Sequence, residues 1–130
     1  MQAVEYGVGR DLNESYDSVL PRVREALKAE GFGVITEIDV KKTMQEKLGV
    51  DGRPHVILGA CNPKLAHAAL AVEADLGLLL PCNVVVYETD AGTRVAVVNA
   101  GAMFGMVGNP ELGPIADEVQ AGLTRVLESL

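Results

Sequence analysis

Two cysteines are the residues of this sequence best suited to chemistry, because a thiolate is both a nucleophile and a soft metal ligand. Cys61 ends a predicted strand and is followed directly by Asn62-Pro63, a pairing of N-cap and first-turn residues that opens many helices. Free backbone N–H groups and the helix dipole at such a start favour a thiolate and can bind an anion. The alternative interpretation is a small buried residue at a tight turn, since free cysteine is among the most buried residue types.

Cys82 follows Pro81 and begins the next long predicted strand, 21 residues after Cys61. If the strands over 55–60 and 82–88 are antiparallel neighbours, the two sulfurs lie at the same end of the sheet, close enough for a disulfide or a shared metal. If the strands are parallel neighbours, the sulfurs lie roughly 20 Å apart. Two sulfurs supply only half of a tetrahedral zinc site, and their spacing matches no zinc pattern.

The two histidines are weaker candidates than the cysteines. His55 shares a strand face with Cys61, but it lies roughly 20 Å away along the strand, too far to act as its direct partner. His67 is expected on the surface of the helix that follows Asn62. A Cys–His–acid triad therefore needs long-range contacts that the sequence does not predict, and we predict no cofactor. A soft-metal site would have to combine the cysteines with Met103 or Met106, which we expect to fill gaps in the core instead.

A run of glycines over 101–113 is not a phosphate-binding fingerprint, because it lacks the Walker lysine and the strand–glycine–helix register. We predict a flexible loop over 100–113 that covers part of the sheet or of a dimer edge.

Composition indicates one ordinary globular domain over residues 1–130, with 48% hydrophobic and 22% charged residues. Two cysteines do not make a disulfide scaffold. No apolar signal segment opens the chain, and charged or polar residues interrupt its most apolar stretch, 65–86. These features predict no membrane span and a cytoplasmic location. The net charge of −7 argues against nucleic acid as a partner, although residues 41–64 carry five basic and two acidic groups.

The hydrophobic periodicity predicts strands and helices in the order β-α-β-(short α)-β-α-β-β-α. Pro21 should bend the first helix or mark its true start. The turn over 89–92 should join the last two strands as a hairpin, which favours an antiparallel sheet with the long helices on one face. The predicted strands are 4–8, 33–40, 55–60, 82–88 and 93–99, and the predicted helices are 15–31, 41–48, 62–75 and 114–127.

The second face of this sheet gives the strongest argument for a partner. The opposite face receives several apolar residues that need a cover if the helices are faced by Val4, Tyr6, Val8, Val56, Leu58, Val95 and Val97. We assign to that face Ile35, Ile57, Val84, Val86, Ala96 and Val98. A second subunit or the glycine-rich loop should cover it, and a symmetric homodimer is the commonest closed assembly.

Two segments carry a family resemblance: Gly59-Ala60-Cys61-Asn62-Pro63 and Leu79-Leu80-Pro81-Cys82-Asn83-Val84-Val85-Val86. Together with the Gly31-Phe32-Gly33 turn, they make the chain resemble the domain of unknown function 302 family over nearly its whole length. The resemblance implies an α+β domain with a TATA-binding-protein-like arrangement and a homodimer. It implies no established activity, and a shared architecture does not imply DNA binding.

We therefore predict a dimeric domain that binds a small molecule or a protein partner, with no reaction readable from the sequence. The predicted ligand-binding residues are Cys61, Asn62, Cys82 and Asn83. The competing hypothesis is a thiol-dependent enzyme or a soft-metal-handling protein that uses Cys61 and Cys82.

Overall fold

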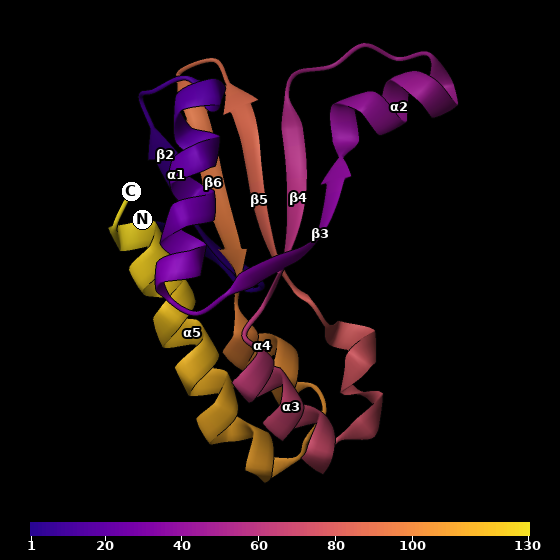
Figure 1. Cartoon of the computed structure of the whole chain (residues 1–130), viewed down its shortest axis with the longest axis vertical. Coiled ribbons are helices and arrows are strands. Elements are labelled where there is room, and N and C mark those ends of the chain that lie inside the picture. The colour runs from indigo at the N-terminus through magenta and orange to yellow at the C-terminus, as the bar shows by residue number, and fades with distance from the viewer.

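A six-stranded sheet, antiparallel throughout, forms the centre of the computed structural model, which describes residues 1–130 (Figure 1). The strand order is β1-β2-β6-β5-β4-β3. The strands are β1 (Gln2–Val4), β2 (Gly7–Leu12), β3 (Gly33–Asp39), β4 (His55–Cys61), β5 (Cys82–Thr89) and β6 (Gly92–Val98). The predicted antiparallel sheet and the β5–β6 hairpin are confirmed.

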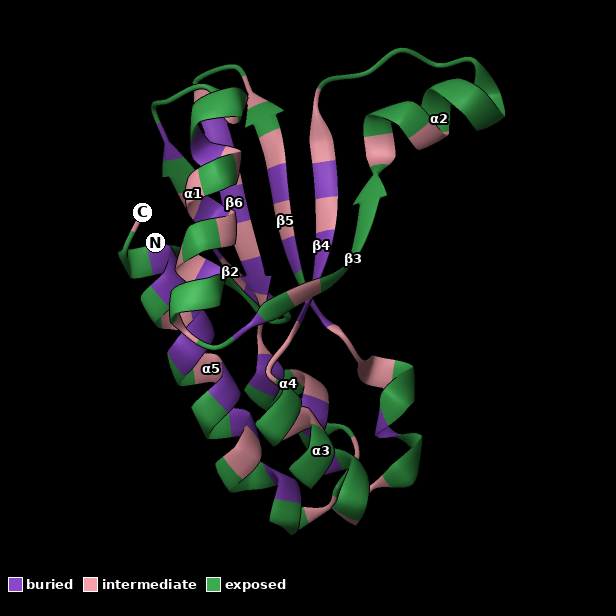
Figure 2. Cartoon of the chain, in the orientation of Figure 1, coloured by how far each residue is buried: buried purple, intermediate pink, exposed green.

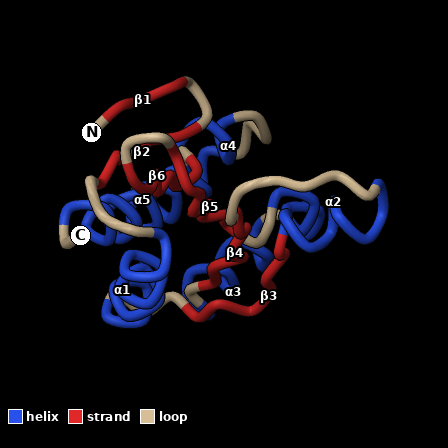
Figure 3. Tube along the Cα trace, turned by 90° about the horizontal axis from the view of Figure 1, so that it is seen from above, coloured by secondary structure: helices blue, strands red, loops and turns tan.

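The helices are distributed unevenly around this sheet. Seen from above, the two long helices, α1 and α5, lie on one side of the sheet, and the short α2 lies on the other (Figure 3). Helices α3 and α4 pack beyond one end of the sheet, against the start of α5 (Figure 1). The helical elements are α1 (Tyr16–Ala29), α2 (Val40–Leu48), α3 (Pro63–Val72), α4 (Ala100–Gly105), α5 (Gly113–Glu128) and the 3₁₀ helices η1 (Ala74–Leu79) and η2 (Pro110–Leu112). The predicted α+β class is therefore confirmed.

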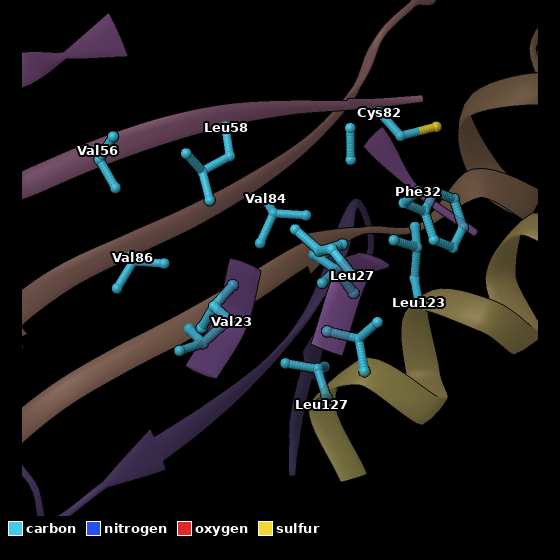
Figure 4. Packing of buried hydrophobic residues seen from close by; sticks show 14 of the residues in the cluster. Val23, Leu27, Phe32, Val56, Leu58, Cys82, Val84, Val86, Leu123 and Leu127 are labelled. Atoms are coloured by element: carbon cyan, nitrogen blue, oxygen red, sulfur yellow. The ribbon is translucent and has the colours of Figure 1, made fainter. Parts of the chain in front are cut away.

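The main core lies between the sheet and the two long helices (Figures 2 and 4). Alternate strand residues point toward α1 and α5, as the two-residue period of a strand requires. From the helices come Val23 and Leu27 of α1 and Leu123 and Leu127 of α5 (Figure 4). The strands contribute Val56, Leu58, Val84, Val86, Val95 and Val97.

The assignment of Val84 and Val86 to the second face is wrong. Both are fully buried in the main core, because β5 pairs with its neighbours so that Val84 lies opposite Leu58 and Val86 opposite Val56. A period of two shows which residues of one strand share a face. It does not show which face a neighbouring strand presents, because that depends on the pairing register.

Most of the segment over 100–113, predicted as a loop, is helical: α4 covers 100–105 and η2 covers 110–112, with a turn between them. Asn99 caps α4 by accepting a hydrogen bond at Oδ1 from the N–H of Ala102, 3.0 Å away. Ala100 and Phe104 are buried, so packing outweighs the low helix propensity of the glycines.

Three further boundaries differ from the prediction. The first predicted strand is split by a turn at Glu5 and Tyr6 into β1 and β2, so Val4 and Tyr6 are exposed and do not face the helices as predicted. Pro21 lies inside α1, which starts at Tyr16 after its Ser15 N-cap, so Pro21 does not mark the start. The helix after Asn62 ends at Val72 because Glu73 adopts extended backbone angles, and a separate 3₁₀ turn, η1, follows.

A second, smaller hydrophobic cluster lies beyond the end of the sheet. Its five buried residues are Ala69, Leu76, Phe104, Leu112 and Ala116. They come from five different helical elements, all short except α5. The chain thus has two hydrophobic clusters that meet near the ends of β4 and β5.

Candidate functional site

A cavity of about 300 Å³ lies where the two hydrophobic clusters meet. Twelve of its fifteen lining residues are hydrophobic. Ile35 and Leu70 are exposed at its rim, where Ile35 is 62% accessible. Its buried walls are Phe32, Ala60, Ala69, Cys82, Phe104 and Val119. The cavity is therefore apolar, deep on one side and open to solvent on the other.

The two cysteines line this cavity together. Strands β4 and β5 are antiparallel neighbours, and Cys82 lies directly opposite Ala60, the residue before Cys61. The antiparallel alternative is thus the correct one, and both thiols lie at the same end of the sheet. Both are free, with Cys61 half-buried and Cys82 buried.

The environment of Cys82 opposes thiolate formation. Burial raises the pKa of the Cys82 thiol to about 11, and the nearby Cys61 adds a like-charge contribution in the same direction. Because only the thiolate is a good nucleophile and metal ligand, a raised pKa makes Cys82 chemically inert near neutral pH. Figure 4 shows Cys82 beside Phe32 at the end of the core, consistent with a packing role.

The two asparagines predicted as ligand-binding residues lie in different places. Asn62 lines the cavity and caps α3, accepting at Oδ1 from the N–H of Leu65, 3.3 Å away. Asn83 is exposed on the second face of the sheet, opposite Gly59, and does not line the cavity. The structure thus brings Cys61, Asn62 and Cys82 together and leaves Asn83 on a separate groove.

The histidines do not join the cysteines. His55 stacks on Tyr87 at the opposite end of β4, with ring centroids 5.0 Å apart and an interplanar angle of 22°. His67 is exposed on α3, and neither histidine lines the cavity. No three His, Cys, Asp or Glu side chains lie together in a way that could hold a metal ion. The thiol-enzyme and soft-metal hypotheses therefore lack a base or a ligand set.

Several cavity residues were missed by the sequence reasoning. A register shift between Val34 and Thr36 makes Ile35 an extra residue in β3, and Ile35 lies on the rim. Phe104 was placed in a loop, and Val119 of α5 is more than thirty residues from either cysteine. Phe32 is the one of these residues that the sequence could have indicated, because it is one of only two phenylalanines and lies between two glycines.

The family model described as "Domain of unknown function DUF302" matches residues 8–130 of the chain. The chain belongs to the DUF302 family. Its fold also matches the crystal structure of an uncharacterized conserved DUF302 protein from Bacillus stearothermophilus, with a TM-score of 0.88 and 32% sequence identity. That match covers 96% of this chain and 98% of the other. The resemblance predicted from the two segments around the cysteines is confirmed, whereas the TATA-binding-protein-like arrangement stays a prediction.

No specific reaction accompanies the DUF302 match. Among curated proteins, none matches this chain. None of the helices of this DUF302 domain is both long enough and apolar enough to span a bilayer.

In this DUF302 domain we expect iodoacetamide to modify Cys61 well before Cys82 at neutral pH. The Cys82 thiol, with its pKa at about 11, should react about tenfold faster with each pH unit until the pH approaches that value. Mass spectrometry of the two cysteine peptides measures both rates. A Cys61→Ser variant lacks the neighbouring thiolate charge. The increase in the alkylation rate of Cys82 with pH should therefore shift to slightly lower pH. Rapid modification of Cys82 in the folded protein at pH 7 would contradict this assignment.

Proposed function

We propose that this domain binds a small, largely apolar molecule in the cavity beside Cys61 and Cys82. The observation that carries the proposal is the cavity itself, of about 300 Å³, with twelve hydrophobic residues among the fifteen that line it. Ligand pockets in proteins are typically concave, mostly apolar and at least this large. The bound molecule would lie between Phe32 and α3, with one end at the rim beside Ile35.

The chemistry of the walls supports an apolar ligand over water. A buried water needs two to four polar partners. Apart from the cysteine thiols, the only polar side chain of the lining is Asn62, whose Oδ1 already accepts a hydrogen bond as the cap of α3. No fully buried side-chain nitrogen or oxygen in the structure lacks a hydrogen-bond partner, so the buried walls present no unsatisfied polar side chain to a ligand. Displacement of poorly bonded water by an alkyl chain is therefore favourable.

The test is a titration with n-decanol, a flexible apolar probe with one small polar end. We expect decanol to bind the wild-type domain in isothermal titration calorimetry, with the negative heat-capacity change that accompanies apolar burial. A leucine in place of Ala66, which lines the cavity, should fill part of the volume and weaken binding at least about tenfold. The matched control is Ala68→Leu, on the exposed side of the same helix, which should bind decanol like the wild type.

Two results would overturn this proposal. One is the absence of decanol binding to a folded wild-type domain. The other is equal binding by the Ala66→Leu and Ala68→Leu variants, which would place the bound alcohol outside the cavity.

We also propose that the domain works as a homodimer in the cytoplasm. Two free cysteines without a disulfide support a reducing compartment. An apolar second sheet face supports a second copy as its cover, and the net charge of −7 opposes nucleic acid as the partner. Light scattering tests the assembly, and a monomeric mass at micromolar concentration would contradict it.

A further inference from the structure

A second groove lies on the face of the sheet that points away from the long helices. Its volume is about 430 Å³, and eight of its twelve lining residues are hydrophobic. Strands β5 and β6 supply much of the lining, because alternate residues of each strand point to this face. These residues are Asn83, Val85, Tyr87, Ala96 and Val98, and the β1–β2 hairpin adds Tyr6.

The groove is hollow because β2 presents glycine to it. Gly7 lies opposite Val98 and Gly9 lies opposite Ala96, so two successive positions of β2 on this face have no side chain. Strand β1 pairs with the other edge of β2, and it lies on the side of β2 away from α1 (Figure 3). A ligand in the groove would therefore meet main chain at β2, between the hairpin and the side chains of β5.

Arg94 is the only charged residue among those that line the groove. Its Nη1 donates to Oε1 of Gln2, 2.5 Å away, and to Oδ1 of Asp11, 3.0 Å away, and neither of these residues lines the groove. The other two nitrogens, Nε and Nη2, form no hydrogen bond with the protein. They are the guanidinium nitrogens nearest to Gly9, where a Cβ would lie 3.1 Å from Nε. One edge of a guanidinium that is mostly buried is thus free beside the groove.

The free edge of Arg94 has the chemistry that recognises a carboxylate. Its Nε–H and one Nη2–H are parallel donors that match the two oxygens of a carboxylate group. The two hydrogen bonds at Nη1 already fix the orientation of the guanidinium, so less conformational freedom is lost when a ligand binds. A phosphate dianion would bring twice the charge of a carboxylate toward Asp11, in a chain whose net charge is −7.

We propose that this groove binds a small monocarboxylic acid, with its carboxylate on Nε and Nη2 of Arg94 and its apolar body over β5 and β6. The inference goes beyond the apolar ligand proposed above, because the groove and the cavity share no residue. It also accounts for Asn83, a predicted ligand-binding residue that lies in the groove and not in the cavity. The proposed homodimer is compatible with this site where the second copy covers the rest of the face, at Ile57 of β4 and Ile38 of β3.

Isothermal titration calorimetry of the full chain tests the proposal with 4-phenylbutyrate and its neutral counterpart, 4-phenylbutanamide. The wild type should bind the acid at least about tenfold more tightly than the amide, because only the acid accepts a pair of charge-assisted hydrogen bonds. This comparison needs no variant. No binding of the acid, or equal affinities for the acid and the amide, would overturn the proposal.

Substitutions of arginine locate the bound acid. Arg94→Gln should weaken acid binding at least about tenfold, and so should Arg94→Lys, which keeps the charge but not the planar pair of donors. Arg24→Gln is the matched control, because it removes an arginine that pairs with Glu37 outside the groove and changes the net charge equally. Equal affinities of Arg94→Gln and Arg24→Gln for the acid would contradict the assignment.

The cavity variant separates this proposal from the apolar ligand. Ala66→Leu should bind 4-phenylbutyrate like the wild type, because Ala66 lines the cavity and not the groove. Weaker acid binding by Ala66→Leu would place the acid in the cavity and overturn the inference. Arg94→Gln should in turn bind decanol like the wild type, so the failure of one proposal is visible without the failure of the other.

Discussion

Replacement of Phe32 by alanine should lower the free energy of unfolding by about 3–5 kcal/mol, the usual cost of deleting a buried phenyl ring. Phe32 is only 3% accessible and stands at the junction of α1, β3 and α5. Its N–H donates to the carbonyl of Leu27 after the left-handed Gly31, whose φ is 82°. This turn directs the ring into the core, where it is buried in the main hydrophobic cluster.

The contact between Phe32 and α5 explains why the free energy of unfolding should fall by as much as about 3–5 kcal/mol in Phe32→Ala. The Phe32 ring packs so closely on Gly122 that a Cβ at this position would lie 2.8 Å from Cε2. The ring also forms a wall of the cavity, so its removal would join the new void to the existing volume of about 300 Å³. A void that cannot collapse costs more than the transfer of the deleted atoms alone.

Urea unfolding followed by circular dichroism measures this loss. Leu78→Ala is the control, because Leu78 is 88% accessible and a surface substitution of this kind should change stability by less than about 0.5 kcal/mol. A decrease of less than about 1 kcal/mol in the free energy of unfolding of Phe32→Ala would contradict this prediction. It would mean that the ring does not stabilise the packing of α5 against the sheet.

The sequence predicted correctly those helix starts and turns that are determined by residues close together along the chain. Asn62-Pro63 starts a helix because the asparagine side chain bonds to the backbone three residues later. The β5–β6 hairpin forms because Gly92 can adopt its φ of 148° at the end of the turn. The same local logic placed Cys61 and Cys82 at strand ends, and the antiparallel pairing then brought them together.

The remaining features depend on contacts between distant segments. The faces of Val84 and Val86 follow from pairing register, which no single strand encodes. Helix α4 forms despite Gly101 and Gly105 because Phe104 is buried in the small cluster. The cavity exists because two hydrophobic clusters meet without merging, and the volume between them cannot be read from either set of residues alone.

Alanine at Gly59 should also destabilise the fold, by about 1–3 kcal/mol, because the site has no room for a methyl group. Gly59 is buried in β4 beneath the side chains of Thr36 and Pro81. A Cβ there would lie 2.7 Å from Cγ of Pro81 and would overlap Oγ1 of Thr36. Removal of glycine from a strand alone would favour folding by about 0.5–1 kcal/mol, which is smaller than the expected steric cost.

The matched control is Gly52→Ala, because a Cβ at Gly52 would meet no atom within 4 Å. That variant should be as stable as the wild type or slightly more stable. Thr36→Ala combined with Gly59→Ala removes the overlap with Oγ1 while leaving the contact with Pro81, so the double variant should recover only part of the loss. The urea unfolding midpoints of the wild type, Gly59→Ala, Gly52→Ala and the double variant measure these differences in stability. Full stability of Gly59→Ala would mean that β3 and Pro81 shift freely, and the rim of the cavity, to which Pro81 belongs, would then be adaptable rather than preformed.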